Sequence, residues 1–554
     1  MPRVCKNWLD FNAHYNKNVI YPEKTKTDIF LDELYRALKQ HNVEQLCFPN
    51  SNIHFIAIIK WYLVSASQCY TAIQLDDEQF TDSVIFPSPF FDDKGQFTLE
   101  KSTLLSRNKP NYRLTVRLMA KYIYINVRTN FDSLRFRPAI FLKNLFQWRW
   151  IVCVEPNALA SKTFQLSGRP VISLPSSFFL KNHERKSSNL DDREDFLEKF
   201  DACLSSLESF LGSCACEKLK KYSVLWLENF FDQLDGVAVR DFGLELLFIG
   251  RQCSDLGSAL IAQFYRKIGV HVVTFDHGSG NAHQCQKSVH WVEYSNSDMF
   301  VTTNSFVAEQ RQRGFSKDYV FSSHETTMVG WRSFASQLAV SPSKDVMIEI
   351  SSSNSALSGA AFPLKISAAN KQKCYKPFRS LDITNIDVLY IGTAYHGWRS
   401  RLRPINNDGE YYRWQNVLLN FFADRSRSMH YRPHPEGATK PPTVLLPKKI
   451  QILTGDFESI RLEDYGLIVF DFIFSSVMPQ IFQSNIPLLF FNTGFPQLTR
   501  VAENMISRNV NYASINLSNS EELLFEQIDQ KCKKIFAELT GREVYESYFN
   551  FDAD

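Results

Sequence analysis

The stretch LLFIGRQCSDLGSALIAQFYRKIGVHVVTF, residues 246–275, decides the fold. Two short apolar runs, Leu246–Ile249 and Val270–Phe275, flank the segment Leu256–Ile268, whose apolar residues recur at helical spacing. Turn residues separate the three pieces. Strand, helix and strand in this order predict a βαβ crossover, in which the two strands lie parallel in one sheet.

The same alternation of short apolar runs and helical segments continues along the chain, which predicts α/β architecture with parallel sheets. In the first half we expect further strands at Glu44–Phe48, Tyr122–Val127, Trp150–Val154, Val171–Leu174 and Met299–Thr302, and helices at Lys26–Gln40, Ile53–Ser67 and Glu194–Leu211. In the second half we expect strands at Val388–Ile391, Ser428–Arg432, Ile450–Leu453, Gly466–Phe470 and Pro487–Phe491, and helices at Tyr412–Phe422, Phe457–Leu462, Val477–Phe482 and Glu521–Leu539.

The length of the chain predicts more than one domain, because a single core rarely serves more than about 250 residues and this chain has 554. The segment from Ser341 to Lys376 is rich in Ser, Ala, Asn and Lys, which is typical of a linker. We therefore expect an N-terminal α/β domain over 1–345, which could divide near 185, a linker at 346–376, and a C-terminal α/β domain with a terminal helix over 377–554. The carboxyl ends of the two sheets would face a cleft.

Charge and composition exclude several classes of protein. Lys and Arg number 62 against 59 Asp and Glu, and this balance gives no strong field to attract nucleic acid. Eleven scattered cysteines indicate a reducing compartment. The first residues contain no apolar run typical of a secretory leader, and no run reaches the length of a membrane span, so we expect a protein that is neither secreted nor transmembrane. We therefore expect a cytoplasmic protein. The aromatic, amphipathic run Tyr222–Leu234 is compatible with contact at a membrane surface, although core packing is the favoured interpretation.

A first candidate site, Asp276-His277-Gly278-Ser279-Gly280, follows directly on the predicted strand Val270–Phe275. The glycines allow a ligand to approach the backbone, and either Asp276 or His277 could act as the base on a substrate hydroxyl. The structural alternative is a turn with a capping aspartate and a satisfied histidine. The sequence does not decide between the two residues.

A second candidate site lies in the C-terminal domain. Gly392-Thr393 forms a small-residue turn after the strand Val388–Ile391, where a nucleotide phosphate can bind. Ser475-Ser476 precede a predicted helix, so their hydroxyls and the first N–H groups of that helix could also hold an anion. Plain N-capping, which needs one serine, is the alternative for this pair.

The loop Arg432-Pro433-His434-Pro435-Glu436 is the most specific motif. Prolines on both sides hold His434 in an extended, stiff segment that presents its imidazole. A histidine in that position could donate a proton to a leaving phosphate, or stabilise the developing charge as a cation. Arg432 could add positive charge or make a structural salt bridge.

These motifs resemble a known group of enzymes. The sequences VLYIGTAYHGWRSRLRP, MHYRPHPEG and YGLIVFDFIFSSVMPQIFQSNIPLLFFNTG are similar to the C-terminal domain of GT-B transferases of bacterial surface polysaccharides. That group includes CDP-glycerol glycerophosphotransferases, capsule and lipopolysaccharide Kdo transferases and bacterial sialyltransferases. The resemblance is good over 389–494, moderate over 245–305, and absent over the first 180 residues. Here three residues separate Asp471 from Ser475, whereas in the teichoic acid enzymes the serines follow an Asp-Tyr pair directly.

The resemblance implies a GT-B-like fold of two Rossmann-like domains facing a cleft, with an N-terminal elaboration. It implies an inverting glycosyltransferase that uses a nucleotide-activated sugar, such as a CMP-linked nonulosonic acid or Kdo, and modifies a surface glycan or glycoprotein, with peripheral inner-membrane contact left open. Thr393, Arg432, His434, Pro435, Glu436, Ser475 and Ser476 would bind the nucleotide, and no metal or cofactor would be needed. The alternatives are a CDP-polyol phosphotransferase, a nucleotide-sugar epimerase of similar fold, and a non-catalytic glycan-binding relative.

Overall fold

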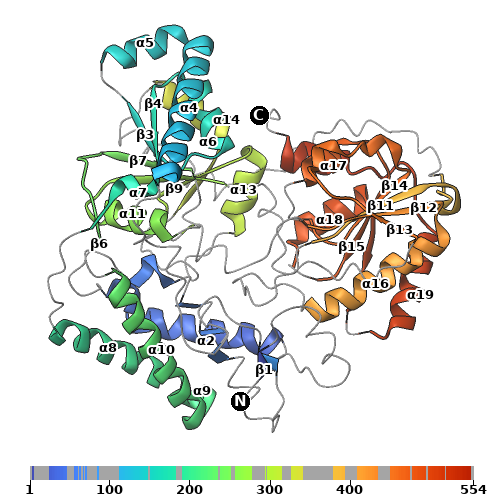
Figure 1. The fold of residues 1–554 in the computed structure, drawn as a ribbon, viewed down its shortest axis with the longest axis horizontal. Helices are drawn as coiled ribbons and strands as arrows, with labels where there is room; N and C mark the ends of the chain where they lie inside the picture. Colours follow the sequence, from blue (N-terminus) through green and yellow to red (C-terminus); the bar gives the residue numbers. More distant parts are fainter. Residues whose placement is uncertain are drawn as a thin grey trace.

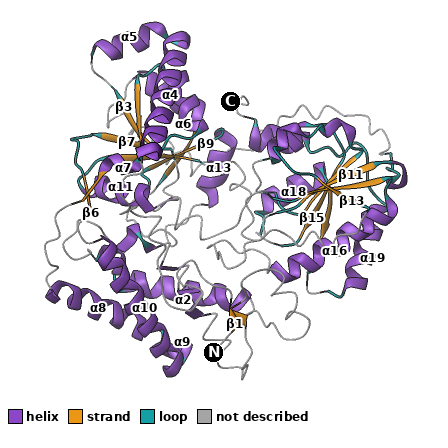
Figure 2. Ribbon diagram, viewed as in Figure 1, coloured by secondary structure: helices purple, strands orange, loops and turns teal. Residues whose placement is uncertain are grey.

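Two parallel sheets of six strands each, with helices around them, form the framework of the molecule in the computed structural model (Figure 1, Figure 2). The structure describes residues 3–4, 24–46, 55–59, 62–63, 66–67, 69–70, 84–85, 112–147, 150–182, 190–234, 237–250, 256–276, 294, 296–314, 326–340, 379–393, 408–434, 449–473, 477–494, 497–517 and 519–550. The predicted α/β class with two Rossmann-like sheets is confirmed. The domain boundaries stay a prediction, because the expected linker lies outside the described residues.

The first sheet has the strand order β10-β9-β8-β7-β3-β4, with every neighbouring pair parallel. Its strands are β3 (Ile151–Val154), β4 (Val171–Leu174), β7 (Leu246–Ile249), β8 (His271–Phe275), β9 (Met299–Thr302) and β10 (Thr327–Gly330). Around it lie α4 (Tyr112–Phe136), α5 (Pro138–Phe146), α6 (Ala158–Ser167), α7 (Ser176–Phe179), α11 (Leu256–Lys267), α13 (Ser305–Gly314) and α14 (Trp331–Val340). The expected βαβ unit is present as β7, α11 and β8. Alternate residues of its strands are buried on both faces, as a parallel sheet between helices requires.

The second sheet has the strand order β13-β12-β11-β14-β15-β16, again all parallel. Its strands are β11 (Asp387–Ile391), β12 (Ser428–Arg432), β13 (Ile450–Ile452), β14 (Leu467–Phe470), β15 (Leu488–Asn492) and β16 (Asn511–Ser514). Helices α16 (Asp408–Arg425) and α19 (Glu521–Cys532) share a core with one face, and α17 (Met478–Gln483) and α18 (Arg500–Asn509) share a core with the other. This order is that of a Rossmann sheet, 3-2-1-4-5-6 in chain order.

A helical layer, α2 (Lys24–Gln40), α8 (Leu190–Ser205), α9 (Glu208–Leu211) and α10 (Ser213–Leu234), adjoins the first sheet. Side chains of α2, α8 and α10 join one core with residues of β7, β8 and α11. Trp226 and Phe230 of α10 are fully buried there, and Trp226 packs edge-on against Tyr62 at 5.3 Å between ring centroids. Core packing of Tyr222–Leu234 is therefore confirmed, and its aromatic residues are not a membrane-facing surface.

Several predicted elements are wrong. Tyr122–Val127 is a short, mostly apolar run that was expected as a strand, yet it lies inside α4. There Asn126 forms two hydrogen bonds with the backbone of Ser173 in the edge strand β4. Val43–Gln45 forms a turn of 3₁₀ helix where a strand was expected. Glu194–Leu211 is interrupted between α8 and α9, and α19 ends at Cys532 rather than at Leu539. Residues 457–464 form two short 3₁₀ helices, Phe457–Ser459 and Leu462–Asp464. Smaller pieces include the two-stranded sheets β1 (Arg3–Val4) with β2 (Val84–Ile85) and β5 (Leu180–Asn182) with β6 (Val237–Val239).

The end of the chain ties the two sheets together. After α20 (Arg542–Val544), residues Tyr545–Phe549 form a π-helical turn. In this turn the backbone carbonyls of residues 547 and 548 accept hydrogen bonds from Asn304 (3.1 Å) and Thr303 (3.4 Å), which directly follow β9. Phe549 stacks on Phe482 of α17 at 5.5 Å. The C-terminal segment thus connects the carboxyl end of the first sheet with a helix of the second.

Candidate functional site

The second sheet reverses its strand order between β11 and β14, which lie side by side. In a Rossmann sheet, ligands bind outside the carboxyl ends of the strands at this point, because the loops leave the two strands toward opposite sides. Gly392 and Thr393 follow β11 directly, and Asp471 follows β14 directly. Arg432 is the last residue of β12, the other neighbour of β11. The structure therefore brings the described residues of the predicted nucleotide site, Thr393, Arg432 and His434, to the ends of two adjacent strands, β11 and β12, beside the end of β14.

A buried carboxylate that we did not predict organises this edge. Asp471 accepts hydrogen bonds from the hydroxyls of Tyr390 (2.7 Å) and Tyr411 (3.0 Å) and from the indole of Trp414 (2.8 Å). Gln415 donates to both tyrosine hydroxyls at 2.9 Å. Burial raises the pKa of Asp471 to about 6, although the hydrogen bonds from the three donors oppose that effect.

The same network fixes the turn after β11. The Thr393 N–H donates to the Tyr411 hydroxyl (2.8 Å), and the Gly392 N–H donates to the Arg432 carbonyl (3.2 Å). A Cβ on Gly392 would lie 2.6 Å from Gln415 Nε2, which explains why glycine stands there. Because the Thr393 N–H is used inside the protein, any contact of this residue with a phosphate must come from its hydroxyl.

The Arg432 guanidinium serves the fold. It is buried and donates to the backbone carbonyls of Leu453 (3.3 Å) and Gly455, in the loop that follows β13. Its charge therefore lies close to the strand end, with two of its N–H groups bonded to backbone carbonyls. His434, partly buried, follows two residues later on the loop that Arg432 anchors. Four predicted site residues, Pro435, Glu436, Ser475 and Ser476, lie outside the described residues.

In the first sheet, Asp276 follows β8 and is held from several sides. Its carboxylate forms an ion pair with Arg311 of α13 (2.6 Å), with side-chain exposures of 0% for Asp276 and 2% for Arg311. Arg311 also donates to the Tyr294 hydroxyl (2.7 Å). The backbone carbonyl of Asp276 accepts from Asn157 (2.8 Å), and its N–H donates to Val301 (2.8 Å). The carboxylate faces the interior. His277 lies outside the described residues.

The first sheet has its own change of strand order, between β3 and β7. At the carboxyl ends of these two strands, the backbone of the protein occupies the place where a ligand would bind. Gly250, after β7, approaches the loop after β3 so closely that a Cβ would lie 2.4 Å from Pro156 Cα and 2.6 Å from the Asn157 N. Asn157 in turn caps α6 by accepting from the Ala160 N–H (2.8 Å). Because backbone occupies this place, the carboxyl end of β8 is the better candidate for a ligand on this domain.

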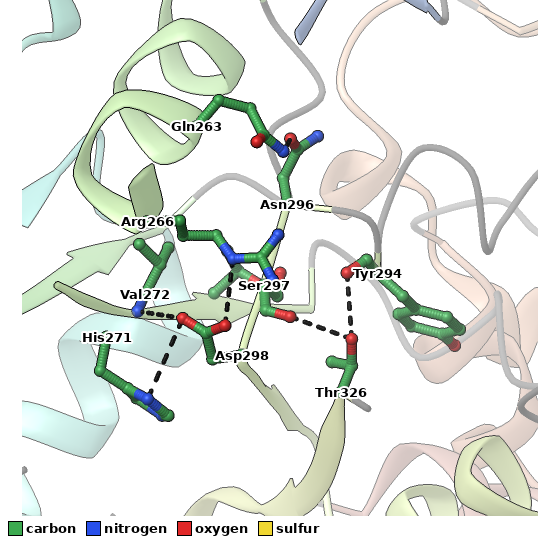
Figure 3. Close-up of polar contacts among 10 residues, drawn as sticks. Gln263, Arg266, His271, Val272, Tyr294, Asn296, Ser297, Asp298 and Thr326 are labelled. Carbon is green, nitrogen blue, oxygen red and sulfur yellow. Dashed lines mark hydrogen bonds and ion pairs between the residues drawn. The ribbon is translucent and has the colours of Figure 1, made fainter. Parts of the chain in front are cut away.

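A polar cluster closes the opposite, amino-terminal edge of the first sheet (Figure 3). Asp298 accepts from Arg266 (3.0 Å) and from the Val272 N–H (2.8 Å), and His271 Nδ1 lies 3.9 Å from its carboxylate. Thr326 donates to the carbonyl of Ser297 (2.9 Å). These contacts join the starts of β8, β9 and β10, so the cluster supports the sheet rather than the candidate site.

Neither a metal site nor a membrane span is found in the part of the chain that the structure describes. Among those residues, no cluster of three or more His, Cys, Asp or Glu side chains could hold a metal ion. Within the same residues, helices that are long enough to cross a bilayer are too polar to do so.

Comparison with known proteins gives distant likenesses only. The chain matches no protein-family model and no curated protein. A structure of the glycotransferase of kitacinnamycin is similar, with 8% identity, a TM-score of 0.29, and coverage of 75% of this chain and 90% of the other. A protein from Listeria monocytogenes described as a putative UDP-N-acetylglucosamine 2-epimerase is also similar, with 9% identity, a TM-score of 0.29, and coverage of 72% of this chain and 93% of the other. Anabaena HepE in complex with UDP-glucose has 11% identity, a TM-score of 0.28 and coverage of 74% and 91%. Likenesses this weak indicate neither a substrate nor a reaction.

Proposed function

We propose that this chain is a glycosyltransferase that takes a sugar from a nucleotide donor bound at the carboxyl edge of the second sheet. One observation carries the proposal: the turn Gly392–Thr393 and the loop behind Asp471 flank the point where a Rossmann-order sheet reverses, and the loop bearing His434 leaves the adjacent strand. That position is where such sheets bind nucleotides. The described motif residues Thr393, Arg432 and His434 lie at this edge, which supports the proposal.

On the donor side, His434 is assigned to the leaving group. As a cation it would donate a proton to the nucleotide phosphate while the bond between the anomeric carbon and the phosphate oxygen breaks. Arg432, two residues earlier, holds this loop and adds positive charge. The Thr393 hydroxyl and the segments Pro435–Glu436 and Ser475–Ser476 would complete the phosphate contacts.

On the acceptor side, the burial of Asp276 favours His277 as the base. The Asp276 carboxylate is paired with Arg311, and its backbone carbonyl and N–H are hydrogen-bonded to Asn157 and Val301. Asp276 therefore holds the backbone in place just before His277. His277 would take the proton of the acceptor hydroxyl as that oxygen bonds to the anomeric carbon. Attack opposite to the leaving phosphate inverts the configuration at this carbon.

The nature of the donor rests on the sequence motifs. Similarity to transferases of bacterial surface polysaccharides supports a CMP-linked acidic sugar as donor and a surface glycan or glycoprotein as acceptor. The donor phosphate of such a sugar leaves as CMP, and a protonated His434 would stabilise that leaving group.

The test is to incubate the purified chain with CMP-, CDP- and UDP-sugars and to measure nucleotide release and the shift in melting temperature. Stabilisation by cytidine nucleotides, with CMP release from a CMP-sugar, supports the proposal. Transfer from a CDP-polyol indicates the phosphotransferase instead, and interconversion of a UDP-sugar without release indicates an epimerase. The absence of any response contradicts an enzymatic role for this site.

Variants sharpen the test. His434→Ala should lower turnover by about 10² to 10⁴-fold with an unchanged melting temperature. The matched control is His430→Ala, four residues earlier on β12, whose imidazole contacts the Tyr465 hydroxyl (2.7 Å) away from the strand end. Full activity of His434→Ala, or an equal loss in both variants, would refute the assignment. His277→Ala should abolish transfer while leaving nucleotide binding intact.

A further inference from the structure

Helix α4 is amphipathic, but its polar side chains face the sheet and its apolar side chains face outward. Asn126 donates to the Ser173 carbonyl (3.1 Å) and accepts from the Ser173 N–H (2.7 Å), and Asn130 makes the same pair of bonds with Val171 at 2.9 Å each. Ser133, also on this face, is fully buried. β4 is the edge strand, so these amides satisfy backbone groups that would otherwise invite another strand.

The outward face of α4 carries large apolar side chains instead. Ile123, Val127 and Phe131 follow one another at four-residue intervals, with exposures of 61%, 65% and 64%. Tyr124 (62%) lies beside them on the same side of the helix. Farther along the chain, Phe136, Leu142 and Phe146 of α4 and α5 are also exposed. A contiguous exposed set of this kind marks an interaction surface, because isolated apolar residues are common but rows of them are not.

A row of basic residues borders this apolar stripe. Lys121, Arg128 and Arg135 are exposed and recur at seven-residue intervals, so they line one edge of the face, next to Tyr124. Over 112–146 the chain has seven basic residues and one acidic residue, Asp132, which accepts a hydrogen bond from Gln165. Both helices stand at the outer end of the first domain, away from the second sheet (Figure 1).

We infer that the exposed face of α4, continued by α5, docks on the surface of an anionic lipid bilayer. Aliphatic and aromatic side chains beside a row of Lys and Arg match the headgroup and acyl boundary of such a membrane. A symmetric contact with a second copy would bring two basic rows into one interface, which like charges disfavour. The inference does not depend on the proposed transferase activity, since no residue of the candidate site takes part.

The test is co-sedimentation of the full chain with vesicles of phosphatidylcholine alone and of phosphatidylcholine with phosphatidylglycerol. We expect binding to the anionic vesicles only, weakened by added salt. The variant K121Q/R128Q/R135Q should lower the partition coefficient by on the order of a hundredfold, because each basic residue contributes several-fold. The variant I123S/V127S/F131S should lower it at least tenfold by the loss of buried apolar area.

The matched control is F210S/L523S, which removes two exposed apolar residues (41% and 43% exposed) from α9 and α19, away from this face. It should bind vesicles like the unchanged chain. Circular dichroism and melting temperature report whether each variant folds, and the basic-row variant decides the matter if the apolar one does not fold. Equal binding to neutral vesicles, equal loss in the control, or no vesicle binding together with a dimer that the apolar variant dissociates would overturn the inference.

Discussion

Asp471 should give the second domain an unusual dependence of stability on pH. Its pKa in the folded chain is about 6, against 3.8 for the ordinary side chain. Folding therefore strengthens proton binding, so the native state holds more protons than the unfolded state between about pH 4 and pH 6. The free energy of unfolding should fall as the pH rises through this window, by about 3 kcal/mol in total.

The variant Asp471→Asn isolates this effect because an amide does not titrate. Between pH 5 and pH 7.5 the unchanged chain should lose about 1.4 kcal/mol that the variant does not lose. For a domain of this size that is about 3 to 6 °C in melting temperature. Scanning calorimetry at several pH values measures it, and the pH slope rather than the absolute stability is compared, because the amide also alters the hydrogen bonds from Tyr390, Tyr411 and Trp414.

The matched control is Asp456→Asn, the same chemical change at an exposed position of the same domain. It should keep the pH slope of the unchanged chain. If the unchanged chain and Asp471→Asn run parallel from pH 5 to pH 7.5, or if the control flattens the slope equally, the reasoning about the buried carboxylate is wrong.

Three further substitutions test the anchors of the two strand ends. Arg311→Met should lower the free energy of unfolding by about 3–5 kcal/mol, because the buried charge of Asp276 loses its ion-pair partner. Adding Asp276→Asn should recover part of this lost stability, measured by thermal unfolding, and the absence of any recovery would contradict this account. Gly392→Ala should cost about 1–3 kcal/mol through the clash with Gln415 and should weaken nucleotide binding measured by calorimetry, whereas unchanged affinity would show that the turn is not part of the site. Arg432→Met should cost about 1–3 kcal/mol by removing the donor to two backbone carbonyls, and an unchanged melting temperature would show that those bonds contribute nothing.

The sequence predicted the sheets well because buried parallel strands appear as short apolar runs between helices. Ser428–Arg432 has the predicted bounds, as has β7 in the βαβ unit over 246–275, where only the end of the helix and the start of the second strand differ, by one residue each. The prediction failed at Tyr122–Val127, because a short apolar run with β-branched and aromatic residues is compatible with either a strand or a helix. The partner that Asn126 of this run finds, the β4 backbone, lies about fifty residues away in the chain.

The candidate site was predictable as a set of strand ends but not as a set of contacts. Gly392–Thr393 and Arg432 lie where the motifs placed them, at adjacent strands. The network around Asp471 was missed because its three donors come from residues 57, 60 and 81 positions away. A local signal existed, since a carboxylate follows directly on the fully buried strand Leu467–Phe470 and must find partners inside.

The two sheets share one feature at the carboxyl ends of their strands: a buried aspartate that holds the backbone in place and takes no direct part in the proposed reaction. Asp276 after β8 and Asp471 after β14 are both buried carboxylates whose charge is satisfied within the protein. Such an anchor holds the backbone at the end of its strand, which cannot rotate there without breaking buried hydrogen bonds. Loop sequence can then vary beyond the anchor without moving its origin.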